Sequence, residues 1–271
     1  MQAEQDKIFE ILILDNASNE AIDSQQIKIS SKLHFFRSET NLGVAKGRNF
    51  LASKAQGDLL WFIDDDASLI TKEATPKITA YFRKAALGVV SFKVINSFSG
   101  EEETRCIPDR KKTPTHQDCL ASYFVGCSFV MRKKAFFEAG GFWEAFGYSC
   151  EELDLSYRLI EFNYQILRSS ILEVQHEFFP EKSRNRNWIY FNTRNRPWLA
   201  IRNLPVFPLL SQTILWWLYG GLVAMKNLEI ILYLKALFDS ILGIPTAFSG
   251  RKVISKESFK KVASLGGRVW Y

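Results

Sequence analysis

The sequence predicts an α/β fold, in which a mostly parallel sheet is flanked by helices and followed by a helical extension at the carboxyl end. Short apolar runs of strand length alternate with longer segments whose apolar residues recur at helical spacing. Several of these runs end in polar or acidic residues. The 271 residues, 47 % of them apolar, suffice for one large domain with an appendage, and they exclude global disorder.

The alternation of predicted strands and helices extends through residue 162. The continuous apolarity of the first strand indicates burial on both faces of the sheet. Helix boundaries are indicated by Gly57, just past one helix, and by Pro76, near the start of the next. The predicted strands are 8–14, 32–36, 58–63, 87–94 and 122–131, and the predicted helices are 44–55, 72–86, 132–139 and 151–162.

The later segments depart from this alternation. Residues 96–119 are polar and rich in turn formers, so we expect a surface loop of the length that often forms a lid. Residues 164–175 form one more extended segment, which ends at His176. Beyond Pro180, arginines alternate with aromatic residues and long apolar stretches follow. We therefore predict two parts, a main domain over residues 1–183 and a helical, apolar and basic extension over residues 184–271.

Charge and cysteine content narrow the function classes. The net charge is +6, and the clustering of Lys and Arg in the second half suits phosphate-bearing ligands or an anionic membrane face. No nucleic-acid motif is present. The four cysteines form no C-x-x-C pair and only three histidines are present, which argues against a cysteine–histidine zinc site. Reduced thiols and a polar start without a signal peptide predict a cytoplasmic protein.

Three consecutive carboxylates, Asp64, Asp65 and Asp66, follow the predicted strand 58–63. Like charges at this spacing repel one another, and a hard cation at the edge of the sheet would relieve that repulsion. Such a cation could also hold a diphosphate. The alternative interpretation is a strand followed by a solvated acidic turn.

Asp15 also follows a predicted strand. Ligands of open α/β sheets bind outside the carboxyl ends of the strands, so Asp15, Asp64 and Asp66 are expected to face one crevice. Asp64 and Asp66 point the same way if the segment is extended. For Asp15, the alternative is a side chain that closes its strand as an Asx-turn.

Two further acids, Glu151 and Glu152, begin the predicted helix 151–162. Acids in a first turn favour the positive end of a helix, which is their structural interpretation. The functional interpretation is a glutamate whose pKa is raised by an aromatic pocket of Trp143, Phe146 and Tyr148, so that it can deprotonate a hydroxyl. His176 is either a structural histidine or a ligand of Mn²⁺ beside a carboxylate.

Five short motifs occur together in the chain. In order, they are Ile13-Leu14-Asp15-Asn16-Ala17-Ser18, Asn41-Leu42-Gly43 with Arg48-Asn49, Phe62-Ile63-Asp64-Asp65-Asp66, Gly140-Gly141-Phe142 and Glu151-Glu152-Leu153-Asp154-Leu155. In that combination the chain resembles family 2 glycosyltransferases of the GT-A fold, in the branch similar to rhamnosyl- and galactofuranosyltransferases. A later segment, Tyr190 with Arg194-Asn195, is similar to one that follows the catalytic domain in this family.

The resemblance implies a role for each matching residue. Glu152 would be the catalytic base, and Glu151 would position donor or acceptor hydroxyls. Asp66 and His176 would hold Mn²⁺ or Mg²⁺. The nucleotide sugar would be bound by Asp15 at the base, by Asp64 at the nucleoside, and by Asn41, Arg48 and Asp65, with Asp65 as a spacer between the outer acids of the D-x-D motif.

The expected function is inverting transfer of a sugar from a nucleotide-diphosphate sugar to a hydroxyl of a cell-surface glycan or a lipid-linked acceptor. The alternative is a truncated, catalytically silent homologue that binds a glycan or a partner enzyme at the membrane. Family members begin with an apolar strand and a helix ahead of the segment that matches residues 13–18. Only seven residues precede Ile8, so we expect both elements to be lacking.

The stretch 203–225 has no charged residue and is long enough to span a bilayer. Prolines, glycines and polar residues dilute it, however. Three arrangements remain open from the sequence: a helical hairpin on the membrane surface, packing on the main domain, and a true span. The arginine and aromatic residues before it fit an interfacial location.

Overall fold

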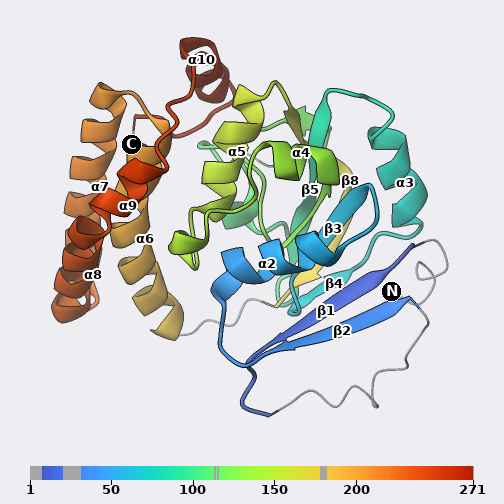
Figure 1. Cartoon of the computed structure of the whole chain (residues 1–271), viewed down its shortest axis with the longest axis horizontal. Helices are drawn as coiled ribbons and strands as arrows, with labels where there is room; N and C mark the ends of the chain where they lie inside the picture. The colour runs from blue at the N-terminus through green and yellow to red at the C-terminus, as the bar shows by residue number, and fades with distance from the viewer. Residues whose placement is uncertain (1–7, 21–31, 113, 115, 178–181, 271) are drawn as a thin grey trace.

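The computed structural model describes residues 8–20, 32–112, 114, 116–177 and 182–270. A central sheet is flanked by helices, and a layer of carboxyl-terminal helices covers one side of the molecule (Figure 1). The predicted α/β class and the carboxyl-terminal helical extension are confirmed.

The main sheet has six strands in the order β3-β7-β5-β8-β4, with β6 paired to β8. Only β5 and β8 run parallel, and the other pairs are antiparallel, so the prediction of a mostly parallel sheet is wrong here. Because helices cover both faces of the sheet, its strands are apolar whether they run parallel or antiparallel. The apolar runs in the sequence therefore did not reveal the strand directions. The strands are β3 (Leu59–Ile63), β4 (Ala67–Leu69), β5 (Leu87–Asn96), β6 (Cys119–Leu120), β7 (Ser128–Arg132) and β8 (Gln165–His176).

Strands β1 (Ile11–Asn16) and β2 (Leu33–Ser38) form a separate, parallel two-stranded sheet. Within the described residues, β1 pairs with no strand other than β2. Side-chain contacts connect it to the rest of the protein: the Glu10 Oε1 atom accepts from the Gly57 amide at 3.0 Å, and the Asn16 Oδ1 atom accepts from the Leu42 amide at 2.8 Å. Both contacts flank helix α2 (Gly43–Lys54), so this helix links the small sheet to the main domain.

Most predicted helices lie within a few residues of their expected bounds. Helix α4 (Lys133–Glu138) and helix α5 (Glu151–Glu161) agree closely with the sequence pattern. Helix α3 (Ala74–Tyr81) is shorter than the predicted 72–86 at both ends. It begins later because Glu73 adopts a left-handed conformation (φ 52°), and it ends where Phe82 leaves the helical region. Strand β4 follows the acidic triplet and was missed, since it has only three residues.

Two apolar cores lie on opposite faces of the main sheet. One contains Ile78 and Phe82 from α3 and its end, packed on Val90 and Val174 of the sheet. The larger one joins α2, α4 and α5 to the sheet. The predicted loop 96–119 crosses the surface and contains one 3₁₀ turn, η1 (Thr104–Cys106), while β6 begins at its end.

Five helices, α6 to α10, form the carboxyl-terminal part of the described chain, and α6 contacts most of the others. Helix α6 contacts α5 on one side and α7, α8 and α9 on the other. Its residues Trp198, Leu199 and Ile201 belong to the larger core, so the extension and the main domain share one apolar interior. The predicted boundary at residue 183 falls inside α6 and stays a prediction. The five helices are α6 (Lys182–Asn203), α7 (Val206–Lys226), α8 (Ile230–Leu242), α9 (Ile244–Ser249) and α10 (Lys256–Ser264).

Candidate active site

The acidic triplet lies where β3 ends and the chain turns into β4. The Asp64 amide donates to the Cys127 carbonyl at 3.0 Å, at the start of β7. The Asp66 Oδ1 atom lies 3.2 Å from the His176 Nε2 atom at the end of β8. Since β4 and β8 pair through Ala67 and His176, the sheet itself holds the histidine beside the acid. Asp66 and His176 thus lie side by side, and their role as metal ligands stays a prediction.

Arg48 on α2 occupies the centre of the site. Its Nη2 atom donates to Asp64 Oδ1 at 2.8 Å and to the Gly126 carbonyl at 2.9 Å. Its Nη1 atom lies 3.5 Å from Glu152 Oε1 and 3.8 Å from Glu151 Oε1. Arg48 therefore joins the D-x-D motif of the main sheet to the two glutamates of α5.

The charges around Arg48 are unbalanced, because one guanidinium faces three carboxylates. Burial opposes its charge, but Asp64, Glu152 and Glu151 together raise the pKa of Arg48. Burial also raises the pKa of Asp64, and Arg48 offsets part of that shift. An acidic excess of this kind favours a further cation.

Glu151 and Glu152 differ sharply in environment although they are neighbours. The Glu151 side chain is 3 % exposed and that of Glu152 is 22 % exposed. Burial, followed by repulsion from Glu152, raises the pKa of Glu151 well above its usual range. In the described residues no group hydrogen-bonds the Glu151 Oε2 atom. Glu151 is therefore the acid whose pKa is raised, and Glu152 is the one that solvent can reach.

The turn before α5 is conformationally strained. Ser149 (φ 66°) and Cys150 (φ 77°) both adopt left-handed conformations that β-carbon-bearing residues disfavour. Such a turn needs support from its surroundings, and α6 provides it. The Asn195 Nδ2 atom lies within hydrogen-bond distance of three carbonyls, those of Phe146 at 3.1 Å, Tyr148 at 2.7 Å and Ser149 at 2.9 Å.

Arg194 adds to this support, since its Nη2 atom donates to the Phe146 carbonyl at 2.6 Å. Arg194 and Asn195 hold the turn that sets the position of Glu151 and Glu152. Sequence reasoning assigned them no role, although the segment with Tyr190 had been singled out as similar to the family.

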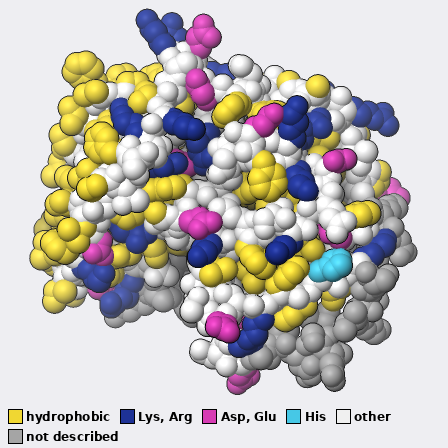
Figure 2. Space-filling view, viewed as in Figure 1, with side chains coloured by type: hydrophobic (Ala, Val, Ile, Leu, Met, Phe, Trp, Pro, Cys, Tyr) yellow, Lys and Arg dark blue, Asp and Glu magenta, His cyan; other side chains and the backbone are white. Residues whose placement is uncertain are grey.

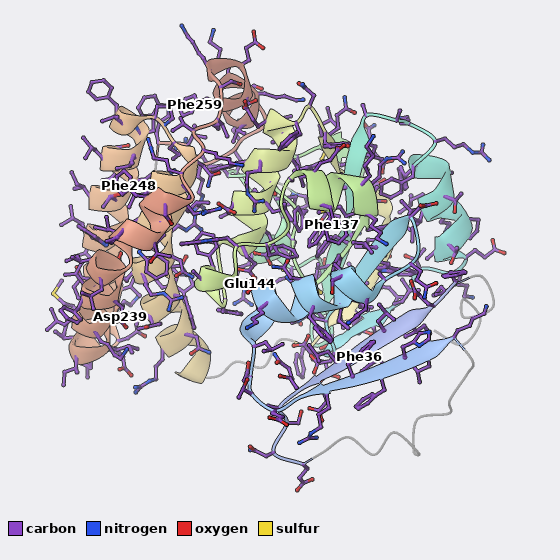
Figure 3. The ribbon with its side chains drawn as sticks, viewed as in Figure 1. Phe36, Phe137, Glu144, Asp239, Phe248 and Phe259 are labelled. Carbon is purple, nitrogen blue, oxygen red and sulfur yellow. The ribbon has the colours of Figure 1, made fainter. Side chains whose placement is uncertain are left out.

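The expected aromatic pocket is only partly formed. Phe146 is buried and packs edge-on against Trp143. Tyr148 is half exposed and contacts Phe191 on α6. These rings stabilise the segment before α5. On the α2 side the same segment is held by Asn49, which donates to Glu144 Oε1 at 3.1 Å; Figure 3 shows Glu144 beside α2.

Gly126 leaves room for the glutamates. A β-carbon at this position would lie 2.1 Å from Glu152 Oε1 and 3.0 Å from both terminal nitrogens of Arg48. Any side chain here would push the Glu152 carboxylate away. Gly126 lies inside the predicted strand 122–131 and carries no signal in the sequence, so its role becomes visible only through its neighbours.

Asp154 completes the acids of the fifth motif but lies in the interior. It is fully buried and accepts hydrogen bonds from Arg158, Arg202 and Asn203. Burial opposes ionisation, but the two arginines and Asn203 lower the pKa of Asp154. This acid connects α5 to α6.

Asp15 and Asn41 form a separate group at β1. Asp15 is buried; its Oδ2 atom lies 2.5 Å from the Arg37 Nη1 atom, and its Oδ1 atom accepts from the Ser18 amide at 2.9 Å. The second contact reaches the amide three residues on and closes the end of the strand, whereas an Asx-turn would join Asp15 to the amide two residues on. Asn41 accepts from the Gly43 amide at 2.8 Å and so shapes the entry to α2. The nucleotide contacts predicted for Asp15, Asn41 and the exposed Asp65 stay predictions.

The donor set fits a divalent metal ion. Asp64, Cys127 and His176 each bring one ligand atom to within 4.8 Å of the others, and Asp66 contacts His176. The carboxylates suit Mn²⁺ or Mg²⁺, imidazole is a ligand more typical of transition metals, and a thiol favours softer metals. Burial raises the pKa of the Cys127 thiol. Sequence reasoning missed Cys127, which is distant along the chain and forms no recognisable cysteine motif.

Comparison with known proteins identifies the family. A family model described as Glycosyl transferase family 2 matches residues 2–139, just over half of the chain. An uncharacterised protein of Haemophilus influenzae is 33 % identical over 141 residues, covering 48 % of this chain and 75 % of that protein. An uncharacterised glycosyltransferase of the same organism is 26 % identical over 163 residues; these cover 56 % of this chain and 52 % of the relative, about half its length.

Solved structures show the same fold at low identity. S. aureus TarS in complex with UDP-GlcNAc has a TM-score of 0.54 at 16 % identity, covering 96 % of this chain and 80 % of that chain. The mannosyltransferase PcManGT from Pyrobaculum calidifontis, in complex with GDP-Man and Mn²⁺, has a TM-score of 0.53 at 13 % identity. The match covers 96 % of this chain and 75 % of that chain. These likenesses confirm the expected GT-A fold. Since the family model matches residues 2–139, more than half of the chain, the chain belongs to glycosyltransferase family 2.

Proposed function

We propose that this protein transfers a sugar from a nucleotide-diphosphate sugar to an acceptor hydroxyl with inversion at the anomeric carbon. The observation that carries the proposal is the convergence on Arg48 of Asp64 from the D-x-D motif and of Glu151 and Glu152 from α5. Donor-binding and proton-accepting groups are thus brought together at one place.

A divalent metal is part of the proposal. Asp66 and His176 would hold it, with Asp64 and Cys127 within reach. When bound, the ion would offset the charge of the departing diphosphate. The Mn²⁺ in the complex of the similar mannosyltransferase supports this assignment, as do the nucleotide sugars in both similar structures.

Glu152 is the proposed base. Its carboxylate is the more exposed of the two glutamates, so an acceptor can approach it. It would take the hydroxyl proton as the acceptor oxygen attacks the anomeric carbon and the bond to the diphosphate breaks. The raised pKa of Glu151 favours its protonated form, in which it would donate a hydrogen bond to a sugar hydroxyl without adding charge beside Glu152. Arg48 fixes the position of both.

The acceptor class and location remain proposals. We infer a hydroxyl of a cell-surface glycan or of a lipid-linked saccharide, reached at the cytoplasmic side of the membrane. All four cysteines are free thiols in the structure, which supports a reducing compartment.

The test is donor turnover with Mn²⁺, with Mg²⁺ and with chelator, in the wild type and in Glu152→Gln. We expect turnover to require the metal and to fall by about 10²–10⁴-fold in the variant, the range for loss of a general base. Glu257→Gln on α10 is the matched control, because Glu257 is exposed and lies outside the site. The anomeric configuration of the product, read by NMR, tests inversion.

Three results would contradict the proposal. Turnover that survives both chelation and Glu152→Gln would remove the metal and the base from the mechanism. A product with retained configuration would exclude the single displacement. Absence of metal-dependent nucleotide-diphosphate binding by calorimetry would favour the alternative, a catalytically silent homologue.

A further inference from the structure

Helix α7 exposes apolar residues on the side where a soluble helix normally carries polar ones. Residues 203–225 contain no charged side chain. The outward residues recur every three or four positions and therefore share one face, with Phe207 79 % and Leu218 62 % exposed. This face of α7 consists of Phe207, Leu210, Ile214, Leu218, Leu222 and Met225.

Helix α8, which packs against α7, continues the exposed apolar surface. Its residues Ile231, Leu234 and Phe238 are 85 %, 54 % and 61 % exposed. We call these three residues and the six of α7 the outer face. Figure 2 shows hydrophobic side chains gathered over this edge of the molecule, where Figure 1 places α7 and α8. Contiguous apolar surface on this scale marks a contact with a membrane or another molecule.

The opposite side of α7 is held against a polar, charged part of the protein. Arg196 of α6 lies 4.2 Å from the Trp216 ring centroid, at the middle of α7. The Gln212 Nε2 atom donates to the Arg268 carbonyl at 2.5 Å, and a β-carbon on Gly220 would meet Thr193 Oγ1 at 2.5 Å. These close contacts run along the helix rather than at one end.

That packing determines how α7 can meet a membrane. By length and composition α7 is the one helix, among the residues the structure describes, that could cross a bilayer. A crossing helix would, however, carry Arg196 and the rest of α6 into the hydrocarbon, where arginine is costly. A helix lying flat keeps α6 on the aqueous side and buries the outer face alone.

The charge pattern favours a lipid surface over an apolar protein partner. Residues 182–271 carry 14 Lys and Arg but only three Asp and Glu, so the extension is strongly basic although the whole chain is only +6. Between residues 204 and 256 the acids are Glu229 and Asp239, and both are ion-paired. Lys226, the last residue of α7, and Lys252, which follows α9, are exposed. Basic side chains beside an apolar face suit anionic headgroups.

We propose that the outer face lies flat on an anionic bilayer surface, with α7 parallel to the membrane and α6 between the lipid and the catalytic site. This goes beyond the proposed transfer reaction, because it concerns where the protein is held rather than what it catalyses. It also selects the surface hairpin among the three arrangements that the sequence left open.

The experiment is flotation of the full chain with phosphatidylcholine vesicles containing 30 % phosphatidylglycerol, compared with pure phosphatidylcholine vesicles. We expect binding to the anionic vesicles, and at least tenfold weaker binding to the neutral ones. The triple variant Leu218→Gln, Leu222→Gln, Ile231→Gln should weaken binding to anionic vesicles by at least 30-fold. Its melting temperature should stay close to the wild-type value, because the three side chains are exposed.

The matched control replaces three exposed apolar residues outside the outer face, in the triple variant Phe98→Gln, Phe162→Gln, Ile171→Gln, and should keep wild-type binding. Three outcomes would overturn the proposal. The wild type does not bind vesicles; or it forms a dimer in solution that the α7–α8 triple variant dissociates, which assigns the face to a second copy; or carbonate washing fails to release it, which indicates a span.

Discussion

Helices α5 and α7 invert the usual pattern of a soluble helix in opposite ways. Helix α5 buries charged residues, among them Glu151, Asp154 and Arg158, in the protein interior. Helix α7 exposes apolar residues such as Phe207 and Leu222 to the outside. Each arrangement costs free energy unless a partner is present, and the nature of the partner differs.

For α5 the partners are within the chain. Asp154 is satisfied by Arg158, Arg202 and Asn203, and the two glutamates face Arg48. For α7 the proposed partner is a lipid surface outside the chain. The comparison teaches that a buried charge whose partners all lie within the protein has a structural role, as Asp154 does. A group that lacks such partners, such as Glu151 or the outer face, indicates a role in binding or catalysis. Five measurements test this distinction, from the largest expected effect to the smallest.

Asp154→Asn should cause the largest loss of stability. It leaves two buried arginines without their carboxylate, a change that typically costs about 3–5 kcal/mol. Thermal or urea unfolding measures it, with the exposed Asp58→Asn as control. A loss below about 1 kcal/mol would mean that the interior of α5 does not depend on this pairing.

Asn195→Ala should cost about 2 kcal/mol of stability, since three carbonyls of the strained turn lose their donor. Because the turn positions the glutamates, turnover should fall about tenfold, while the KM for the donor changes little. The control is Asn187→Ala, at an exposed position of the same helix. Unchanged turnover in a destabilised protein would make Asn195 structural only.

Gly126→Ala should separate activity from stability. The added β-carbon collides with the flexible end of Glu152, which can swing away at little cost in stability. We expect turnover to drop about tenfold, about 1.4 kcal/mol of activation free energy, with a melting temperature within about 2 °C. Gly57→Ala, whose β-carbon would make only ordinary contacts, is the control. Full activity in Gly126→Ala would argue against Glu152 as the base.

Glu151→Gln should produce a small, pH-dependent gain in stability. Because the pKa of Glu151 is raised in the folded state, the folded protein retains a proton that the unfolded chain releases above pH ~4.5. The free energy of unfolding of the wild type therefore declines as the pH rises through this window, and the glutamine variant avoids that decline. Melting temperatures from pH 4.5 to 8 should diverge by about 2 °C in favour of the variant. A constant difference would refute the raised pKa.

Leu222→Gln should have the smallest effect of all. The side chain is 60 % exposed, so the free energy of unfolding in solution should change by less than about 0.5 kcal/mol. A loss above about 1 kcal/mol would show that the outer face contributes to the fold itself and would remove the contrast with α5.

The sequence predicted the fold class and most helices of the main domain, because these depend on local periodicity and on short motifs. It did not predict strand direction, since apolar runs buried on both faces look alike in parallel and antiparallel sheets. Cys127, Gly126 and Asn195 were missed for a related reason. Their roles depend on contacts with residues distant along the chain, and no local pattern marks such contacts.

The acids show the same limit. Glu151, Glu152 and Asp154 all lie in one sequence motif. The motif does not reveal that Asp154 is enclosed in ion pairs, that Glu151 is buried or that Glu152 is partly exposed. Burial depends on the packing of α5 against α6. The residue types therefore predicted that acids take part in the chemistry, whereas the role of each individual acid depends on tertiary packing.

Helix α6 also determines the distance between the outer face and the turn before α5. Consecutive residues of this helix contact both neighbours: Thr193 and Arg196 meet α7, and Arg194 and Asn195 hold the turn before α5. A helix is about 10 Å thick with its side chains. If the outer face rests on lipid, this single layer fixes how high the catalytic turn stands above the headgroups. Acceptors would then be selected by how far their hydroxyl projects from the membrane, as well as by their chemistry.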